Sequence, residues 1–162
     1  MSEENLEEVV GQLLVEQGLT LGVAESCTGG LVTHRLTNVP GSSNYLLGGV
    51  VAYSYDVKER VLEVHHDTLY EHGAVSRETA LEMARGARRL LGSDVALAVT
   101  GIAGPGGGTA EKPVGLVYIA LAARDSEHCE RYVWSGDRLQ NKQRSSQAAL
   151  EMLREYLEGR AR

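Results

Sequence analysis

The stretch of this chain most suited to chemistry is ESCTGG at residues 25–30, which combines a carboxylate, two hydroxyls, a thiol and two glycines. An apolar run at 19–24 precedes it and another begins at Leu31, so the stretch is predicted to be a turn from a buried strand into a helix. Open α/β sheets place their ligands in such turns. Ser26 or Cys27 could attack a substrate there.

The glycines and the flanking side chains of this turn allow two interpretations. In the functional one, the exposed amides of Gly29 and Gly30 bind an anion or a developing oxyanion beside the attacking group. In the structural one, Ser26 and Thr28 cap the helix, because Ser and Thr are preferred N-caps, while Glu25 complements the helix dipole. The residues alone leave both interpretations open.

A second cluster, YSYDVK at residues 53–58, could supply the base that a serine nucleophile needs. Lysine acts as a base when burial or a neighbouring cation lowers its pKa toward neutrality. Lys58 is a candidate for that role, and Tyr53 could orient it or relay a proton. The alternative is a solvent-facing lysine at the start of a helix, which is common in globular proteins.

The glycine-dense segment TGIAGPGGG at residues 100–108 is predicted to be a loop. It matches neither the GxxxxGK[ST] nor the GxGxxG fingerprint, which argues against ATP hydrolysis and a dinucleotide fold. A loop of backbone amides can still bind one phosphate, with Lys112 or Arg138 as the cation. A plain tight turn and a surface arginine are the alternatives.

Composition limits the class of protein. The 162 residues are expected to form one domain, 1–162, with 43% hydrophobic residues and no apolar stretch approaching the roughly 20 residues of a membrane helix. The acidic, polar N-terminus does not resemble a signal peptide. With 22 acidic and 16 basic residues the formal charge is −6, which disfavours nucleic-acid binding. Cys27 and Cys129 are expected to be reduced thiols in a cytoplasmic protein.

Periodicity predicts an α/β fold, a mixed central sheet with helices on its faces. The five histidines show no metal-ligand spacing, so we expect neither a metal nor another cofactor. We expect helices over 2–17, 31–36 and 58–64, a helix capped by Ser76, and a last helix capped by Asp137 and Gln140. We expect strands over 19–24, 48–55, 94–100, 114–123 and 129–134, the last two forming a hairpin.

The segments of interest are AESCTGG at 24–30, PGSS at 40–43, YS…K at 53–58, HGAVS at 72–76, TGIAGPGGG at 100–108, EKPVG at 111–115 and SGDR at 135–138. In order and spacing they resemble the C-terminal domain of the CinA competence/damage-inducible family, which includes stand-alone nicotinamide-nucleotide amidohydrolases. The resemblance covers nearly the whole chain. It implies a single-domain three-layer α/β/α sandwich.

The resemblance also implies an activity, the hydrolysis of the carboxamide of nicotinamide mononucleotide (NMN) to nicotinate mononucleotide and ammonia in pyridine-nucleotide salvage. The family is described as metal-independent, with a serine nucleophile and a lysine base. Carried over, Ser26 is the nucleophile, Lys58 its base and Tyr53 a supporting hydroxyl. Glu25, Thr28, Ser43, Thr100 and Arg138 also stand at family motif positions and are expected to bind substrate. The residues themselves add Gly29 and Gly30 as oxyanion donors, and Gly101, Gly104 and Lys112 as part of a phosphate-binding loop.

One position departs from the family pattern. Four residues after the arginine of SGDR the family often has a second arginine, whereas this chain has Lys142. Three rival interpretations remain: a non-catalytic nucleotide-binding or regulatory module, a Cys27 nucleophile, and an amidase for another small amide. The expected partners are the small-molecule substrate and further copies of the chain in a homo-oligomer, with no nucleic acid and no membrane.

Overall fold

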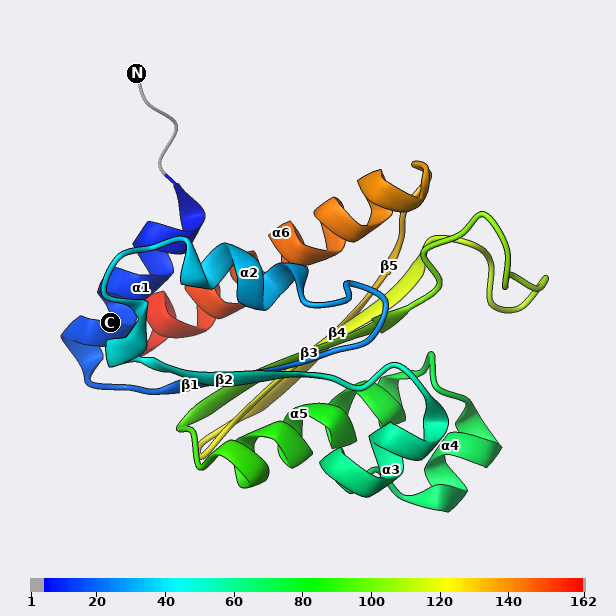
Figure 1. Cartoon of the computed structure of the whole chain (residues 1–162), viewed down its shortest axis with the longest axis horizontal. Helices are drawn as coiled ribbons and strands as arrows, with labels where there is room; N and C mark the ends of the chain where they lie inside the picture. Colours follow the sequence, from blue (N-terminus) through cyan, green and yellow to red (C-terminus); the bar gives the residue numbers. More distant parts are fainter. Residues whose placement is uncertain (1–4, 162) are drawn as a thin grey trace.

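The computed structural model describes residues 5–161, and its centre is a five-stranded sheet with helices on both faces (Figure 1). The elements in chain order are α1 (Leu6–Gln17), β1 (Leu21–Glu25), α2 (Leu31–Thr37), the 3-10 turn η1 (Ser42–Asn44), β2 (Leu46–Val51), α3 (Tyr55–Leu62), α4 (His66–His72), α5 (Arg77–Leu91), β3 (Val95–Gly101), β4 (Leu116–Ala123), β5 (Glu127–Val133) and α6 (Arg138–Ala161).

The sheet has the strand order β2-β1-β3-β4-β5. Its first three strands are parallel, whereas β4 runs antiparallel to β3 and β5 runs antiparallel to β4. Helices α1, α2 and α6 cover one face, and α3, α4 and α5 cover the other (Figure 1). The predicted α/β/α sandwich with a mixed sheet is therefore confirmed.

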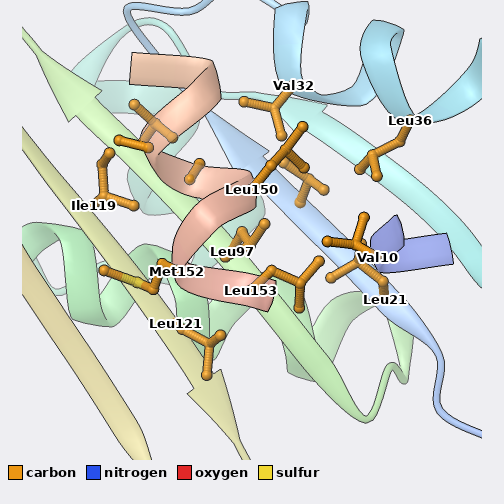
Figure 2. Close-up of a cluster of buried hydrophobic side chains, with 14 of the residues drawn as sticks. Val10, Leu21, Val32, Leu36, Leu97, Ile119, Leu121, Leu150, Met152 and Leu153 are labelled. Atoms are coloured by element: carbon orange, nitrogen blue, oxygen red, sulfur yellow. The ribbon is translucent and has the colours of Figure 1, made fainter. Parts of the chain in front are cut away.

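The central strand β3 shows why the two faces pack differently. Side chains alternate along a strand, so Val95, Leu97 and Val99 point to one face while Ala96 and Ala98 point to the other. The larger side chains join the core beneath α1, α2 and α6, part of which Figure 2 shows. The alanines leave room for α5, which presents an alanine-rich face of its own to the sheet.

Helix ends follow the signals in the sequence. Gly18 ends α1 in the left-handed conformation, with φ of 66°. The Ser76 hydroxyl accepts a hydrogen bond from the Thr79 amide, 3.1 Å away, at the start of α5. Asp137 and Gln140 exchange two hydrogen bonds of 2.9 Å before α6, as a capping box does. The start expected for the first helix, Ser2, lies outside the described residues.

The prediction was wrong around the second strand. The strand expected over 48–55 covers Leu46–Val51 instead, because the Ser54 side chain accepts a hydrogen bond from the Val57 amide at 3.1 Å and starts α3 there. Lys58 consequently lies inside α3, not at its start. The short helix α4 had not been predicted. Among residues 5–161, no helix combines the length and apolarity needed to cross a bilayer.

Candidate active site

Three parallel strands bring the candidate residues to one edge of the sheet. Glu25 at the end of β1 pairs with Val51 of β2 on one side and with Val99 of β3 on the other. Ser26 follows directly, and its amide donates to the Val99 carbonyl at 3.0 Å. The segments that leave β1, β2 and β3 therefore meet, which is where an open α/β sheet places a ligand.

Ser26 and Lys58 form a buried pair at this edge. The Lys58 Nζ donates to the Ser26 Oγ across 3.0 Å. Lys58 is 1% exposed and Ser26 is 7% exposed, so little water reaches either group. The predicted nucleophile and its predicted base are thus in direct contact, although 32 residues separate them in the sequence.

Two backbone carbonyls orient the lysine. Nζ also donates to the carbonyl oxygens of Ala52 at 2.8 Å and Tyr53 at 3.0 Å, in the segment between β2 and α3. An ammonium group has three N–H bonds, and all three have partners here. When the amine loses a proton, the two carbonyls keep two N–H bonds in place, and the lone pair faces the Ser26 hydroxyl.

Burial sets the protonation states of the lysine and of the neighbouring thiol. It lowers the pKa of the Lys58 ammonium from 10.5 to about 8, because a charged group is poorly solvated inside the protein. At pH 7 roughly one tenth of the lysine is then a neutral base. Burial raises the pKa of the Cys27 thiol to about 12, so the reactive thiolate is scarce near neutral pH.

Arg138 lies at the rim of the site. One of its terminal nitrogens donates to the Gly104 carbonyl at 2.7 Å and the other to the Tyr53 hydroxyl at 3.2 Å. Tyr53 is 61% exposed, so its ring stands at the entrance while its carbonyl holds Lys58. These contacts place Arg138 beside both the Ser26–Lys58 pair and the glycine loop.

The pair opens into a small cavity of about 220 Å³. Thr100 and Gly101, from the end of β3, form part of its wall, and the Thr100 hydroxyl donates to the Ala74 carbonyl at 2.7 Å. The lining residues are Ser26, Cys27, Tyr53, Lys58, Ala74, Val75, Thr100, Gly101, Ala103 and Arg138.

Glu25 has a positioning role in this structure. Its buried carboxylate accepts hydrogen bonds from the amides of Val32 and Thr33, at 2.9 and 3.0 Å, and from the Thr33 hydroxyl at 2.7 Å. It therefore holds the first turn of α2 against the end of β1. Of the two interpretations of this turn, capping by Ser26 and Thr28 does not hold, because neither side chain caps α2 and the Glu25 carboxylate accepts the amides of its first turn.

The glycine turn has one amide engaged and one available. Gly29 donates its N–H to the Ser26 carbonyl at 3.0 Å, so it is not free to bind an oxyanion. The N–H of Gly30 forms no hydrogen bond within residues 5–161. The Thr28 hydroxyl is buried and has no hydrogen-bond partner among the same residues. Both glycines have positive φ, 60° and 104°, which explains the residue type.

Two predicted substrate-binding residues lie away from the cavity. Ser43 is part of η1 and precedes β2, so it lies at the opposite end of the parallel strands from Ser26. The Lys112 ammonium donates to the His72 carbonyl, which holds it beside α4. Gly104 is not among the residues that line the cavity, and its carbonyl accepts a hydrogen bond from Arg138.

Some of the site could not be inferred from side-chain types. The Ala52 carbonyl orients Lys58, but a backbone acceptor leaves no mark in the sequence. Ala74 and Val75 line the cavity and belong to the HGAVS segment, for which the sequence suggested no role. Within the described part of the chain, no group of three or more His, Cys, Asp or Glu side chains is arranged to hold a metal ion.

The fold and the site define an α/β protein with a buried serine–lysine pair at the carboxyl edge of its sheet. The model of the CinA C-terminal domain family matches residues 3–157. A CinA-like protein of Geotalea uraniireducens is 54% identical over 154 residues, which cover 95% of this chain and 37% of that protein. This chain belongs to the CinA C-terminal domain family.

Solved structures of the same family have the same fold. The competence/damage-inducible protein CihA from Agrobacterium tumefaciens has a TM-score of 0.88 at 42% identity, covering 94% of this chain and 96% of that one. A CinA superfamily protein from Klebsiella pneumoniae has a TM-score of 0.92 at 33% identity, covering 97% and 99%. The chain spans about two fifths of the length of the curated relatives it matches.

Proposed function

We propose that this chain is an amidohydrolase that converts NMN and water to nicotinate mononucleotide and ammonia. The observation that carries the proposal is the buried 3.0 Å contact between Ser26 and Lys58, in which burial brings the pKa of the lysine to about 8. A serine hydroxyl is a weak nucleophile unless a base accepts its proton, and the contact and the lowered pKa support Lys58 as that base.

In the acylation step, the Ser26 Oγ attacks the carboxamide carbon while its proton passes to Nζ of Lys58. The carbonyl oxygen becomes an oxyanion, for which the free Gly30 N–H is a candidate donor. The C–N bond then breaks as the Lys58 ammonium gives its proton to the departing nitrogen. Ammonia leaves, and the substrate remains as an ester on Ser26.

In the deacylation step, water replaces ammonia next to Lys58. The neutral amine takes a proton from this water, the resulting hydroxide attacks the ester carbon, and the Ser26 oxygen leaves with the proton that Lys58 returns. The carbonyls of Ala52 and Tyr53 hold the amine through both steps. The products are a carboxylate and the free enzyme, and no cofactor takes part.

The cavity supports a substrate of which only the amide-bearing ring is enclosed. Its volume of about 220 Å³ is below the roughly 300 Å³ at which pockets begin to enclose whole drug-sized ligands. The ribose and phosphate of NMN would then extend past the rim, where Arg138 lies. A nucleotide with a small amide at one end and a dianion at the other suits this arrangement.

The test is to incubate the purified protein with NMN and to measure ammonia and nicotinate mononucleotide. We expect equal amounts of both products, and none from a Ser26→Ala variant whose circular dichroism matches the parent. Nicotinamide and asparagine serve as comparison amides. Binding of NMN by folded protein without ammonia release would refute the proposal and favour the regulatory alternative.

A further inference from the structure

Lys142 lies on the face of α6 that packs against the candidate active site. Arg138, one helical turn earlier, contacts Gly104, and Asn141 donates to the Ala103 carbonyl at 3.0 Å. The Lys142 side chain is directed to the turn that contains Gly29. A Cβ on Gly29 would stand 3.6 Å from the Lys142 Nζ. Its ammonium therefore covers the glycine turn that follows Ser26.

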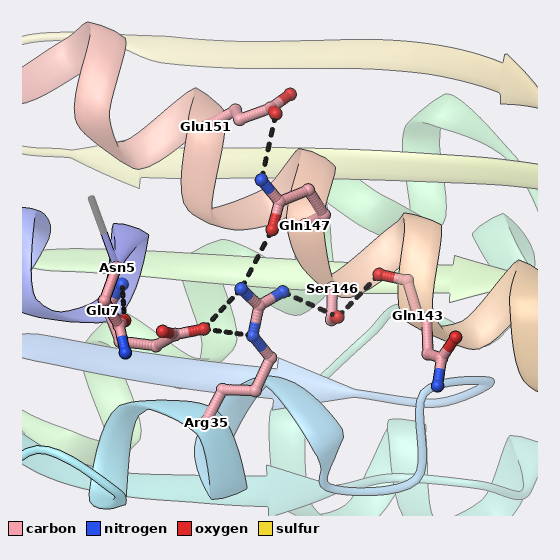
Figure 3. Close-up of polar contacts among 7 residues, drawn as sticks. All are labelled: Asn5, Glu7, Arg35, Gln143, Ser146, Gln147 and Glu151. Atoms are coloured by element: carbon pink, nitrogen blue, oxygen red, sulfur yellow. Dashed lines mark hydrogen bonds and ion pairs between the residues drawn. The ribbon is translucent and has the colours of Figure 1, made fainter. Parts of the chain in front are cut away.

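This lysine is a cation without a partner. Six arginines pair with carboxylates in the described chain, as Arg35 does with Glu7 in the cluster of Figure 3. Of the lysines and arginines within residues 5–161, Lys142 is the half-buried one with neither a hydrogen bond nor an ion pair. In a protein of net charge −6, an unpaired and partly desolvated cation is costly unless an anion joins it.

Unused hydrogen-bond donors lie in the same turn. The buried Thr28 hydroxyl has no partner, and the Gly30 N–H is free, both within the described residues. The positive charge of Lys142 also acts on Cys27, a wall residue of the cavity, and favours its thiolate against the larger effect of burial. The Lys142 ammonium and these two donors could therefore bind an anion, and they lie close to the cavity that Ser26 and Cys27 line.

Arg138 and Lys142 can act on one anion. They are four residues apart on α6, so their side chains leave the same helix face about 6 Å apart along the axis. One N–H of each terminal nitrogen of Arg138 donates to Gly104 or Tyr53. The remaining N–H groups of the guanidinium can donate to a ligand. Lys112, the other cation considered for this role, is held by His72.

On the basis of the function proposed above, we propose that Lys142 and Arg138 bind the phosphate of the nucleotide together, and that Lys142 makes the site select nucleotides over nucleosides. The phosphate would bridge the two cations just outside the cavity, while the carboxamide reaches Ser26. Lys142 makes no contact with the reacting amide and is a substrate-binding residue.

The experiment compares NMN with nicotinamide riboside, which has the same amide and ribose and lacks the phosphate. In the Lys142→Met variant we expect the KM for NMN to rise about tenfold or more, as for the loss of one charge-assisted hydrogen bond, with kcat within about twofold. The kcat/KM for the riboside should not change. Arg124→Met is the matched control, because it removes one exposed cation after β4, at the opposite end of the sheet from Ser26, and should alter neither substrate.

The outcomes separate this inference from the proposed function. If NMN is hydrolysed but Lys142→Met affects NMN and the riboside equally, or behaves like Arg124→Met, the phosphate role of Lys142 is wrong and the enzyme proposal stands. If the parent protein releases no ammonia, calorimetric titration measures its affinity for NMN and for the riboside, and this comparison tests the phosphate role of Lys142. A phosphate-dependent affinity that Lys142→Met abolishes supports the anion site, and equal binding of both ligands overturns it.

Discussion

The Lys58→Met substitution tests the physical basis of the site, because it removes the amine and keeps a side chain of similar length in the same buried space. In the folded protein burial lowers the pKa of Lys58 to about 8, whereas in the unfolded chain it is near the ordinary 10.5. Protonated lysine is therefore disfavoured by folding. The wild-type protein loses stability as the pH falls from about 10.5 to about 8, and the full penalty applies below that range.

The size of this pH-dependent penalty follows from the shift. A difference of about 2.5 pKa units, at 1.36 kcal/mol per unit, amounts to about 3 kcal/mol. Methionine does not titrate, so the stability of Lys58→Met relative to wild type should rise by about 3 kcal/mol between pH 10.5 and pH 7. The hydrogen bonds that methionine cannot make to Ser26, Ala52 and Tyr53 add an offset that varies little with pH.

Urea denaturation of both proteins at pH 7, 8, 9 and 10.5 measures this difference. Groups that titrate in both proteins cancel when one free energy of unfolding is subtracted from the other. A difference that stays constant across the range would show that the folded environment does not perturb Lys58. Lys58 would then be almost fully protonated at pH 7 and could not serve as a neutral base.

Three further predictions follow from the same contacts. The kcat/KM for NMN should increase about tenfold per pH unit below pH 8 and level off above it, because the neutral Lys58 is the active form; a rate independent of pH would contradict this. Glu25→Gln should lower the free energy of unfolding by about 2 kcal/mol in urea titrations, since its hydrogen bonds to α2 lose their charge assistance, and unchanged stability would refute the capping role. Tyr53→Phe should reduce kcat/KM less than tenfold, because the carbonyl that holds Lys58 remains; complete inactivation would give the hydroxyl a direct catalytic role.

Much of the fold could be predicted because periodicity and capping residues act locally. The alternation along β3 and the capping box of Asp137 and Gln140 are examples. The second strand was placed too late, because an apolar run does not reveal that Ser54 will cap a helix. α4 was missed because seven residues carry too little pattern.

The candidate site was predictable where side-chain chemistry and family resemblance coincide, as at Ser26 and Lys58. It was not predictable where the answer depends on the fold. Glu25 stands next to Ser26 in the sequence, yet its carboxylate turns toward α2. Ser43 shares a family motif, yet the direction of β2 carries it to the other end of the sheet. Lys142 stood out only as a departure from the family pattern, and its position over Gly29 depends on how α6 packs.

The central claim is that Ser26 attacks the carboxamide with Lys58 as its base, and the covalent intermediate tests it most directly. The protein should be mixed with NMN, quenched in acid within the first turnovers, digested, and examined by mass spectrometry. The acyl group of the substrate should be attached to Ser26 in the wild-type protein and should be absent from Lys58→Met. A label on Cys27, or turnover by Ser26→Ala, would contradict it.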